Sequence, residues 1–333
     1  MKVLVTGGAG YIGSTVCSAL LDAGHTPVIL DSLITGKKEF TQGREFYCGD
    51  IADEALLDSI LSAHPDIGCA IHLAALIVVP DSVARPYEYY RENVSKSLLL
   101  FNNLISKGLN KIVFSSSAAM YGDTPDFVVT EASRLDPKSP YSRTKFIIEM
   151  MLEDFSAAYG LNSISLRYFN VIGADPKYRT GLHNAMPSHV LGKLVSVADG
   201  ALDKFYITGT DWPTRDGTGI RDFIHVWDLA RAHVLAVEKF DGVVKKFGSG
   251  YVPINLGCNN GVTVREMLAA FESVYGRKIA CELAPPRAGD VAGVYADTSR
   301  AAEYLGWKPE LTTEDGIRDA LGWSKARKQI LGY

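Results

Sequence analysis

A glycine-rich turn lies at the start of the chain, between a short apolar run and a helical pattern. The segment VTGGAGYIGS carries Gly7, Gly10 and Gly13, and residues 8–13 also fit the pattern GxGxxG. A turn this tight needs residues without a Cβ, so that the backbone can approach an anionic ligand and the helix can pack close to the strand. The helix N-terminus offers that anion free N–H groups and a positive dipole end. In this context the pattern predicts a site for a dinucleotide pyrophosphate.

Apolar runs and helical patterns alternate through the first half of the chain. Runs typical of strands occupy 2–6, 26–31, 45–51, 69–75, 111–117 and 162–173, and helical patterns occupy 14–24, 54–63, 86–108 and 142–160. Alternation at this spacing predicts a parallel sheet with helices on both faces. We therefore expect the α/β class, with a doubly wound parallel sheet that forms a Rossmann domain.

This rhythm ends after Gly173. Loops rich in Pro, Gly and Asp follow, with helical patterns near 186–199, 227–239 and 263–275. We expect a Rossmann domain over 1–172 and a smaller mixed α/β domain over 173–333. The strand-like segments FIHV and PINLG, within about 220–260, are expected to return to the first sheet.

Composition excludes several classes of partner and site. The 34 basic residues are balanced by 38 acidic ones without a basic run, which argues against nucleic acid as a partner. The five cysteines are scattered without a CxxC, and no two of the seven histidines are four residues apart, so we expect no disulfide framework and no metal site. This cysteine pattern favours a reducing, cytoplasmic location. The apolar run AIHLAALIVV is too short for a membrane span, and the opening strand leaves no room for a signal peptide.

A carboxylate follows the second predicted strand. Asp31 comes 18 residues after Gly13, where an acidic side chain can accept hydrogen bonds from the adenine-side ribose hydroxyls of NAD and repel the 2′-phosphate of NADP. The sequence therefore predicts NAD as the cofactor. Asp50 and Ile51, after the third strand, are candidates for the adenine edge, although a plain loop fits them nearly as well.

Tyr141 and Lys145 lie at the start of the predicted helix over 142–160, in the segment SPYSRTK. Residues four apart share a helix face, so the phenol and the ammonium can approach each other. A phenol with a pKa of about 10 is a poor base at neutral pH, but a nearby Lys⁺ and an oxidised nicotinamide ring both lower that pKa. Ser117 ends the strand 111–117 at the edge where parallel strands line a ligand crevice, although serines also cap strand ends. The pair Tyr304 and Lys308 has the same spacing, but it encloses Gly306 and indicates a helix end.

Seven segments occur together in one order: VTGGAGYIGS, Asp31, GDI at 49–51, SSSAAMYGD, SPYSRTK, LRYFNVIGA and DGTGIRDFIHVWDLA. With this order and spacing the chain resembles the extended short-chain dehydrogenase/reductase family over nearly its whole length, and within it the UDP-hexose 4-epimerases. SSSAAMYGD and DGTGIRDFIHVWDLA are the most specific of these segments.

The resemblance implies a mechanism. Tyr141, as phenolate, takes the proton of the sugar 4-hydroxyl, and Ser117 hydrogen-bonds the 4-oxygen. The C4 hydride goes to NAD, the transient 4-keto sugar turns over, and the hydride returns to its other face, so that NAD is retained. Lys145 holds the nicotinamide ribose and tunes Tyr141. The expected reaction interconverts UDP-glucose and UDP-galactose.

The resemblance also implies two sets of contacts. The first domain would bind NAD through Gly7, Gly10, Tyr11, Ile12, Gly13, Asp31, Asp50, Ile51, Leu73, Ala74, Ala75, Asn93, Ser115, Tyr141, Lys145 and Tyr168. The second domain would bind the UDP-sugar, with Arg221 and Arg287 on the diphosphate, Asp290 on the uridine ribose, Asn170 and Asn184 on the sugar and phosphate, and Tyr206 near the uracil. Each arginine taken alone would be interpreted as a surface ion pair.

The chain departs from the family pattern at two positions. Ile77 stands where the family pattern has a lysine that contacts the cofactor, so we expect looser retention of NAD. Val294 stands where epimerases restricted to plain hexoses carry a tyrosine. The smaller side chain predicts action on UDP-N-acetylglucosamine and UDP-N-acetylgalactosamine as well. Ordinary core packing is the alternative for Val294.

Other functions remain open at this point. A nucleotide-sugar dehydratase needs an acid and a base after the serines, and Ala118 and Ala119 supply neither. A UDP-glucuronate 4-epimerase differs only in contacts that sequence does not resolve, and a non-catalytic NAD-sensing protein would have no use for Ser117, Tyr141 and Lys145 together.

Helices 87–107 and 142–158 carry more apolar residues than one sheet face needs, which predicts a homodimer. Core packing alone is the alternative.

Overall fold

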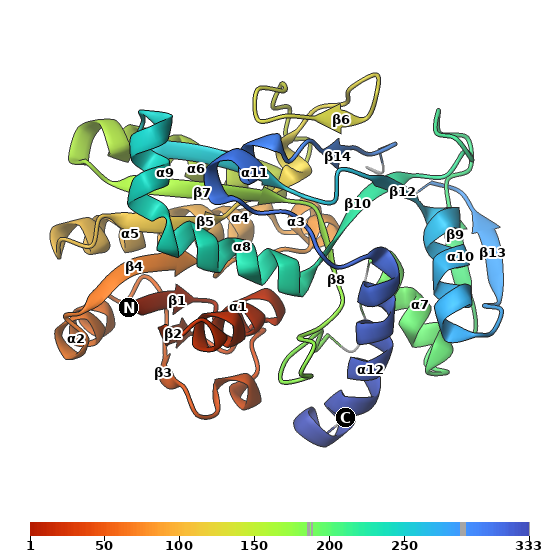
Figure 1. The fold of residues 1–333 in the computed structure, drawn as a ribbon, viewed down its shortest axis with the longest axis horizontal. Helices are drawn as coiled ribbons and strands as arrows, with labels where there is room; N and C mark the ends of the chain where they lie inside the picture. The colour runs from red at the N-terminus through yellow and green to blue at the C-terminus, as the bar shows by residue number, and fades with distance from the viewer. Residues whose placement is uncertain (185–186, 188, 287–290, 333) are drawn as a thin grey trace.

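The computed structural model describes residues 1–184, 187, 189–286 and 291–332. Its centre is a parallel sheet of seven strands (Figure 1). In chain order these are β1 (Lys2–Thr6), β2 (Thr26–Asp31), β3 (Glu45–Cys48), β4 (Ile67–His72), β5 (Lys111–Ser115), β7 (Asn162–Tyr168) and β11 (Tyr251–Leu256). Across the sheet they lie in the order β11-β7-β5-β4-β1-β2-β3, and every neighbouring pair is parallel. The predicted doubly wound α/β class is confirmed.

Helices cover both faces of this sheet. One buried cluster contains Val3 and Val5 of β1 with side chains of α1 (Tyr11–Asp22), α8 (Val226–Glu238), α9 (Phe240–Phe247) and α11 (Ser299–Leu305). The other contains Leu4 with side chains of α2 (Glu54–Ala63), α5 (Lys96–Ser106) and α6 (Pro140–Tyr159). Alternate residues of a strand point to opposite faces, so the apolar runs of the buried strands supply both clusters.

The strand order reverses at β1. The chain builds β2 and β3 on one side of β1 and then crosses to β4, β5 and β7 on the other. In open parallel sheets the crevice outside the carboxyl ends of the strands at such a reversal receives the ligand. The glycine turn after β1 and the serines at the end of β5 lie at this edge of the sheet.

The predicted helix over 86–108 is built from three pieces. α4 (Pro86–Tyr89) leads into a π-helical turn at Tyr90–Ser95, and α5 continues from it. The short helix α3 (Val79–Ala84) precedes them and was not predicted. π-helical turns inside α-helices are frequent at functional sites, and this one carries Asn93.

One predicted strand is wrong. The run 162–173 divides at Phe169, because β8 (Asn170–Ile172) leaves the large sheet and pairs with β10 (Ile220–His225). β10 also pairs with β12 (Gly261–Thr263), so the FIHV segment belongs to a second, three-stranded sheet and does not return to the first. The PINLG segment, in β11, does lie in the large sheet, beside β7.

The remaining elements gather beyond this second sheet, at the right of Figure 1. They are α7 (Val190–Ala198), α10 (Val264–Tyr275), α12 (Thr313–Leu331), and the parallel pair β9 (Phe205–Thr208) and β13 (Cys281–Ala284). They share a separate buried cluster that includes Leu194, Phe271 and Ile317. A last pair, β6 (Val128–Val129) and β14 (Tyr295–Ala296), lies near the end of β10, and short 3₁₀ turns occupy Lys38–Thr41 and Ala118–Met120. Across the described ranges, no helix combines the length and apolarity needed to cross a membrane.

Candidate active site

The glycine turn has the shape that its sequence predicted. Gly7 has a φ of 72°, in the left-handed region, and a Cβ there would lie 2.7 Å from the backbone nitrogen of Ala74. A Cβ at Gly13 would lie 2.1 Å from the carbonyl oxygen of Gly7. Gly10 precedes the first residue of α1 and provides no side chain to bond the N–H groups of the first turn. The turn therefore leaves a backbone cradle and a helix N-terminus for an anionic group, which fits the pyrophosphate of a dinucleotide.

The two residues that follow Gly10 turn their side chains inward. The Tyr11 hydroxyl donates to the carbonyl oxygen of Gly173 at 2.7 Å, and burial raises its pKa. Ile12 packs against the large core cluster of α1 and α8. A contact of these two residues with a cofactor would therefore use their backbone N–H groups.

Asp31 is fixed beside the turn. Its buried carboxylate accepts hydrogen bonds from the backbone nitrogens of Ala9 at 2.9 Å and Leu33 at 2.8 Å. A carboxylate has about four lone-pair positions, so acceptor capacity remains for ribose hydroxyls. After β3, Asp50 forms a 2.5 Å ion pair with Lys96, and the side chain of Ile51 lies in the core.

The segment after β4 lies against the turn. The backbone nitrogens of Leu73 and Ala74 donate to the carbonyl and the hydroxyl of Thr6, at 3.1 and 3.5 Å. The half-buried Ala75 continues this segment.

Asn93 anchors the same segment from the π-helical turn. Its buried amide bonds both the N–H (2.8 Å) and the carbonyl (3.0 Å) of Leu76, and it also donates to the Thr144 hydroxyl of α6 at 3.1 Å. The side chain thus links the loop after β4 to the helix that carries Tyr141.

Tyr141, Lys145 and Ser117 lie together at the end of β5. α6 begins at Pro140 and is capped by Ser139 in a capping box, which places Tyr141 in its first turn. The Ser117 hydroxyl forms a hydrogen bond with Tyr141. Burial raises the pKa of the Tyr141 phenol, and the Ser117 hydrogen bond opposes this rise. Tyr304, of the other Tyr–Lys pair with a four-residue spacing, instead packs against Phe247, with 5.8 Å between the ring centroids.

Lys145 is buried beneath this group. Its Nζ donates to the carbonyl oxygen of Ser115 at 2.8 Å and lies 4.9 Å from the centre of the Phe114 ring. Burial lowers the pKa of Lys145 to about 7, and the negative charge of Glu149 acts in the opposite direction. Ser115 also hydrogen-bonds the hydroxyl of Tyr168, at the end of β7. Burial raises the pKa of Tyr168, and the nearby Tyr141 adds to the rise.

Among the residues predicted to bind the substrate, Arg221 lies on β10. The guanidinium of Arg221 donates to the carbonyl oxygens of Ile220 at 2.7 Å, Ala292 at 2.8 Å and Val291 at 3.1 Å. Arg221 therefore holds the backbone of Val291 and Ala292, just before Val294, by hydrogen bonds. Val294 packs against the cluster of Ala118, Tyr121 and Val129, which Phe169 also joins. Since Ala118 follows Ser117 directly, this cluster adjoins the end of β5.

The other predicted substrate residues are spread over neighbouring elements. Asn170 begins β8, opposite Phe223 of β10. Tyr206 lies on β9, half exposed, in register with Glu282 of β13. Asn184 is exposed just before α7. Arg287 and Asp290 lie outside the described residues.

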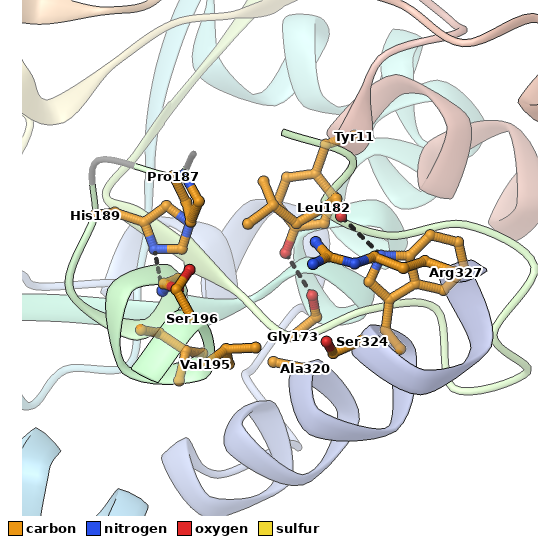
Figure 2. Close-up of a pocket in the computed structure, with 13 residues that line it drawn as sticks. Tyr11, Gly173, Leu182, Pro187, His189, Val195, Ser196, Ala320, Ser324 and Arg327 are labelled. Atoms are coloured by element: carbon orange, nitrogen blue, oxygen red, sulfur yellow. Dashed lines mark hydrogen bonds between the residues drawn. The ribbon is translucent and has the colours of Figure 1, made fainter. Parts of the chain in front are cut away.

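A small cavity lies behind Tyr11, between α7 and α12 (Figure 2). Its volume is about 30 Å³, which suffices for roughly two water molecules and excludes a nicotinamide or a sugar. His189, Ser324 and Arg327 line it. In the described part of the chain, His189 Nε2 and Arg327 Nε have no hydrogen-bond partner, so ordered water is the occupant that fits.

Sequence reasoning missed the polar groups that support this site. Glu149 and Arg167 form a buried ion pair under the end of β5, and Ser116 bonds to it. Glu149 is four residues after Lys145 on the same helix face, which was the available signal. Its partner Arg167 comes from another strand, and nothing in the local pattern links the two.

Comparison with known proteins agrees with this geometry. Residues 3–252 match the model of the NAD dependent epimerase/dehydratase family. The UDP-glucose 4-epimerase of Azospirillum brasilense is 41% identical, over 99% of this chain and 94% of that protein. The crystal structure of the UDP-glucose 4-epimerase of Stenotrophomonas maltophila, with bound NAD and formylated UDP-arabinopyranose, superposes with a TM-score of 0.92 at 36% identity and covers 99% of both chains. That of Bifidobacterium longum, in complex with NAD⁺ and UDP, gives 0.91 at 35% identity over 98% of both chains. These similarities confirm the resemblance, and the chain belongs to the NAD dependent epimerase/dehydratase family, among the isomerases represented by the UDP-glucose 4-epimerases.

Proposed function

We propose that this protein interconverts UDP-glucose and UDP-galactose by epimerisation at C4, with NAD as a retained cofactor. The observation that carries the proposal is the group formed by Tyr141, Lys145 and Ser117 at the end of β5, next to the glycine turn. A base, a cation and a hydroxyl donor at this edge of the sheet suit the removal and return of a hydroxyl proton.

The residues that would hold NAD fit its parts. The Gly7–Gly13 cradle would hold the pyrophosphate, the Asp31 carboxylate would accept from the adenine-side ribose, and Lys145 and Tyr168 would contact the nicotinamide end. When bound, NAD supplies reversible hydride acceptance next to the sugar C4.

Tyr141 and Ser117 have different proposed roles in the transfer of the 4-hydroxyl proton. Tyr141 takes the proton from the 4-hydroxyl, and Ser117 holds both Tyr141 and the 4-oxygen. Burial opposes the phenolate, so the positive charge of Lys145 is needed to lower the pKa of Tyr141 again. In the opposite direction Tyr141 returns the proton to the product.

UDP-N-acetylhexosamines are proposed as additional substrates. Val294 packs against the cluster that contains Ala118, the residue after the proposed catalytic Ser117. We place its side chain at the border of the space for the reacting sugar. A valine leaves room there that a tyrosine would fill. Arg221 and Arg287 are proposed to contact the diphosphate, Asp290 the uridine ribose, Asn170 and Asn184 the sugar and phosphate, and Tyr206 the uracil.

A homodimer is proposed through α5 and α6. Leu100, Phe101 and Ile148 lie in the core, whereas Leu98, Leu99 and Met150 are exposed on the same helices. Pairing with a second copy would remove this apolar surface from water. A cytoplasmic location also stays a prediction.

A substrate panel tests the function. The purified protein is incubated with UDP-glucose, UDP-N-acetylglucosamine or UDP-glucuronate, products are separated by chromatography, and the absorbance of reduced nicotinamide is followed. The proposal expects the C4 epimers of the first two substrates. Turnover of UDP-glucuronate alone would support the uronate epimerase instead, and the absence of turnover with every substrate would support a non-catalytic NAD-binding protein.

A further inference from the structure

A buried carboxylate lies one turn beyond Lys145 on α6. Glu149 Oε2 accepts from Arg167 Nη2 at 2.6 Å, and Arg167 Nε lies 3.0 and 3.1 Å from the two carboxylate oxygens. Both side chains are almost fully buried. Replacing a buried ion pair by apolar residues is often neutral or stabilising, so its presence is weak evidence for a role in stability alone.

Two hydroxyl groups complete the bonding of Glu149. Ser116 Oγ donates to Oε1 at 2.5 Å from the end of β5, and Tyr251 donates to Oε2 at 2.6 Å from β11. Ser116 is the middle residue of the serine triplet, and its backbone nitrogen is held by the carbonyl of Leu166 at 2.9 Å.

The three serines meet three successive turns of α6. The Ser117 hydroxyl bonds Tyr141, the Ser115 carbonyl bonds Lys145, and the Ser116 hydroxyl bonds Glu149. Tyr141, Lys145 and Glu149 are spaced by four residues and share one helix face. Among the hydrogen bonds that the structure describes between these two segments, the one from Ser116 to Glu149 is the only one that does not involve a residue proposed to contact the reactants.

We propose that Glu149 is a positioning residue: by holding Ser116 it fixes the end of β5 against α6, and so keeps Ser117 aligned with Tyr141. This inference rests on the proposed epimerase function. A displacement of about 1 Å in a reacting group can lower a rate by up to about a hundredfold, so the loss of this tie should act on the chemical step. The residues proposed to bind UDP lie on other elements and should keep their affinity.

The test compares two variants that each remove one hydroxyl bonded to Glu149. Ser116→Ala deletes the tie to β5, while Oε1 keeps its contact with Arg167 at 3.0 Å, so the ion pair and the fold remain. Tyr251→Phe deletes the hydrogen bond to the other oxygen and is the matched control. Steady-state kcat and KM are measured with UDP-galactose, together with the thermal unfolding midpoint.

Ser116→Ala is expected to lower kcat about tenfold, with KM within about twofold of the parent, and Tyr251→Phe to change both by less than about twofold. A kcat within twofold of the parent in Ser116→Ala would overturn the inference, as would an equal loss in Tyr251→Phe. A parent protein without epimerase activity would overturn the proposed function itself, which separates the two failures.

Discussion

The ammonium group of Lys145 donates a hydrogen bond to the carbonyl oxygen of Ser115 across 2.8 Å, at the point where α6 meets the end of β5. Only 2% of Lys145 is exposed. The cation is therefore held by a carbonyl dipole, the face of Phe114 and the more distant charge of Glu149, in a place where burial disfavours it. The environment of Lys145 therefore disfavours the charged form, which has a measurable effect on stability.

The stability of the NAD-free protein should depend on pH through Lys145. Burial lowers its pKa to about 7 in the folded protein, from 10.5 in the unfolded chain. Between these values the unfolded chain binds the extra proton, so folding becomes more favourable as pH rises, by up to about 1.4 kcal/mol per pH unit. Lys145→Met should remove this contribution. The variant should therefore have a higher free energy of unfolding than the parent at pH 7, and this difference should shrink towards pH 9. Urea unfolding at a series of pH values measures it, and a difference that is constant with pH would contradict the prediction.

Val294→Tyr should change the substrate range. The phenol ring would need space next to the cluster of Ala118, Tyr121 and Val129, which Val294 contacts and which we propose borders the sugar. We expect turnover of UDP-N-acetylglucosamine to fall by at least about tenfold, while turnover of UDP-glucose stays within about threefold of the parent. The ratio of kcat/KM for the two substrates is the measurement, and UDP-glucose serves as the internal control. An unchanged ratio would show that Val294 belongs to the core alone.

Ile77→Lys should tighten the retention of NAD. Ile77 is 62% exposed and follows Leu76, whose backbone is hydrogen-bonded to Asn93. A lysine at position 77 can therefore extend without disturbing the core. A gain of one charge-assisted hydrogen bond to the cofactor predicts an affinity increase of about tenfold. The amount of NAD that remains after gel filtration reports it. Val83→Lys, at a position with 65% exposure in the same segment, is the control for added charge. Full and non-exchangeable occupancy in the parent would contradict the expectation of loose retention.

Leu99→Glu should weaken self-association. Leu99 is 49% exposed on α5, and a carboxylate there would be buried without a partner in the proposed dimer. Analytical ultracentrifugation over a range of concentrations should show the parent as a dimer and the variant shifted towards monomer. Leu21→Glu, which places the same charge at a 42% exposed position of α1, should leave the dimer intact. A parent that is monomeric at all concentrations would reject the dimer.

Periodicity was sufficient to predict the large sheet, because its inner strands are buried on both faces and the helices bury apolar stripes against them. Local pattern could not show the break at Phe169, since Val171 and Ile172 continue the apolar run and only pairing with β10, some 50 residues later, takes β8 out of the sheet. The glycine turn, Tyr141 and Lys145 were predictable because each depends on neighbours close in sequence. The partnership of Glu149 with Arg167 and Tyr251 was not, since it joins one helix to two separate strands.

The central claim is that Tyr141 is the base that exchanges a proton with the sugar 4-hydroxyl. Tyr141→Phe removes the phenol oxygen and keeps the ring, and Tyr304→Phe makes the same change in a tyrosine that packs against Phe247. The measurement is kcat with UDP-galactose together with the NAD content of each variant. Tyr141→Phe should lose at least about a hundredfold in kcat and still bind NAD, whereas Tyr304→Phe should stay within about twofold of the parent. Equal activity of the two variants would contradict the assignment.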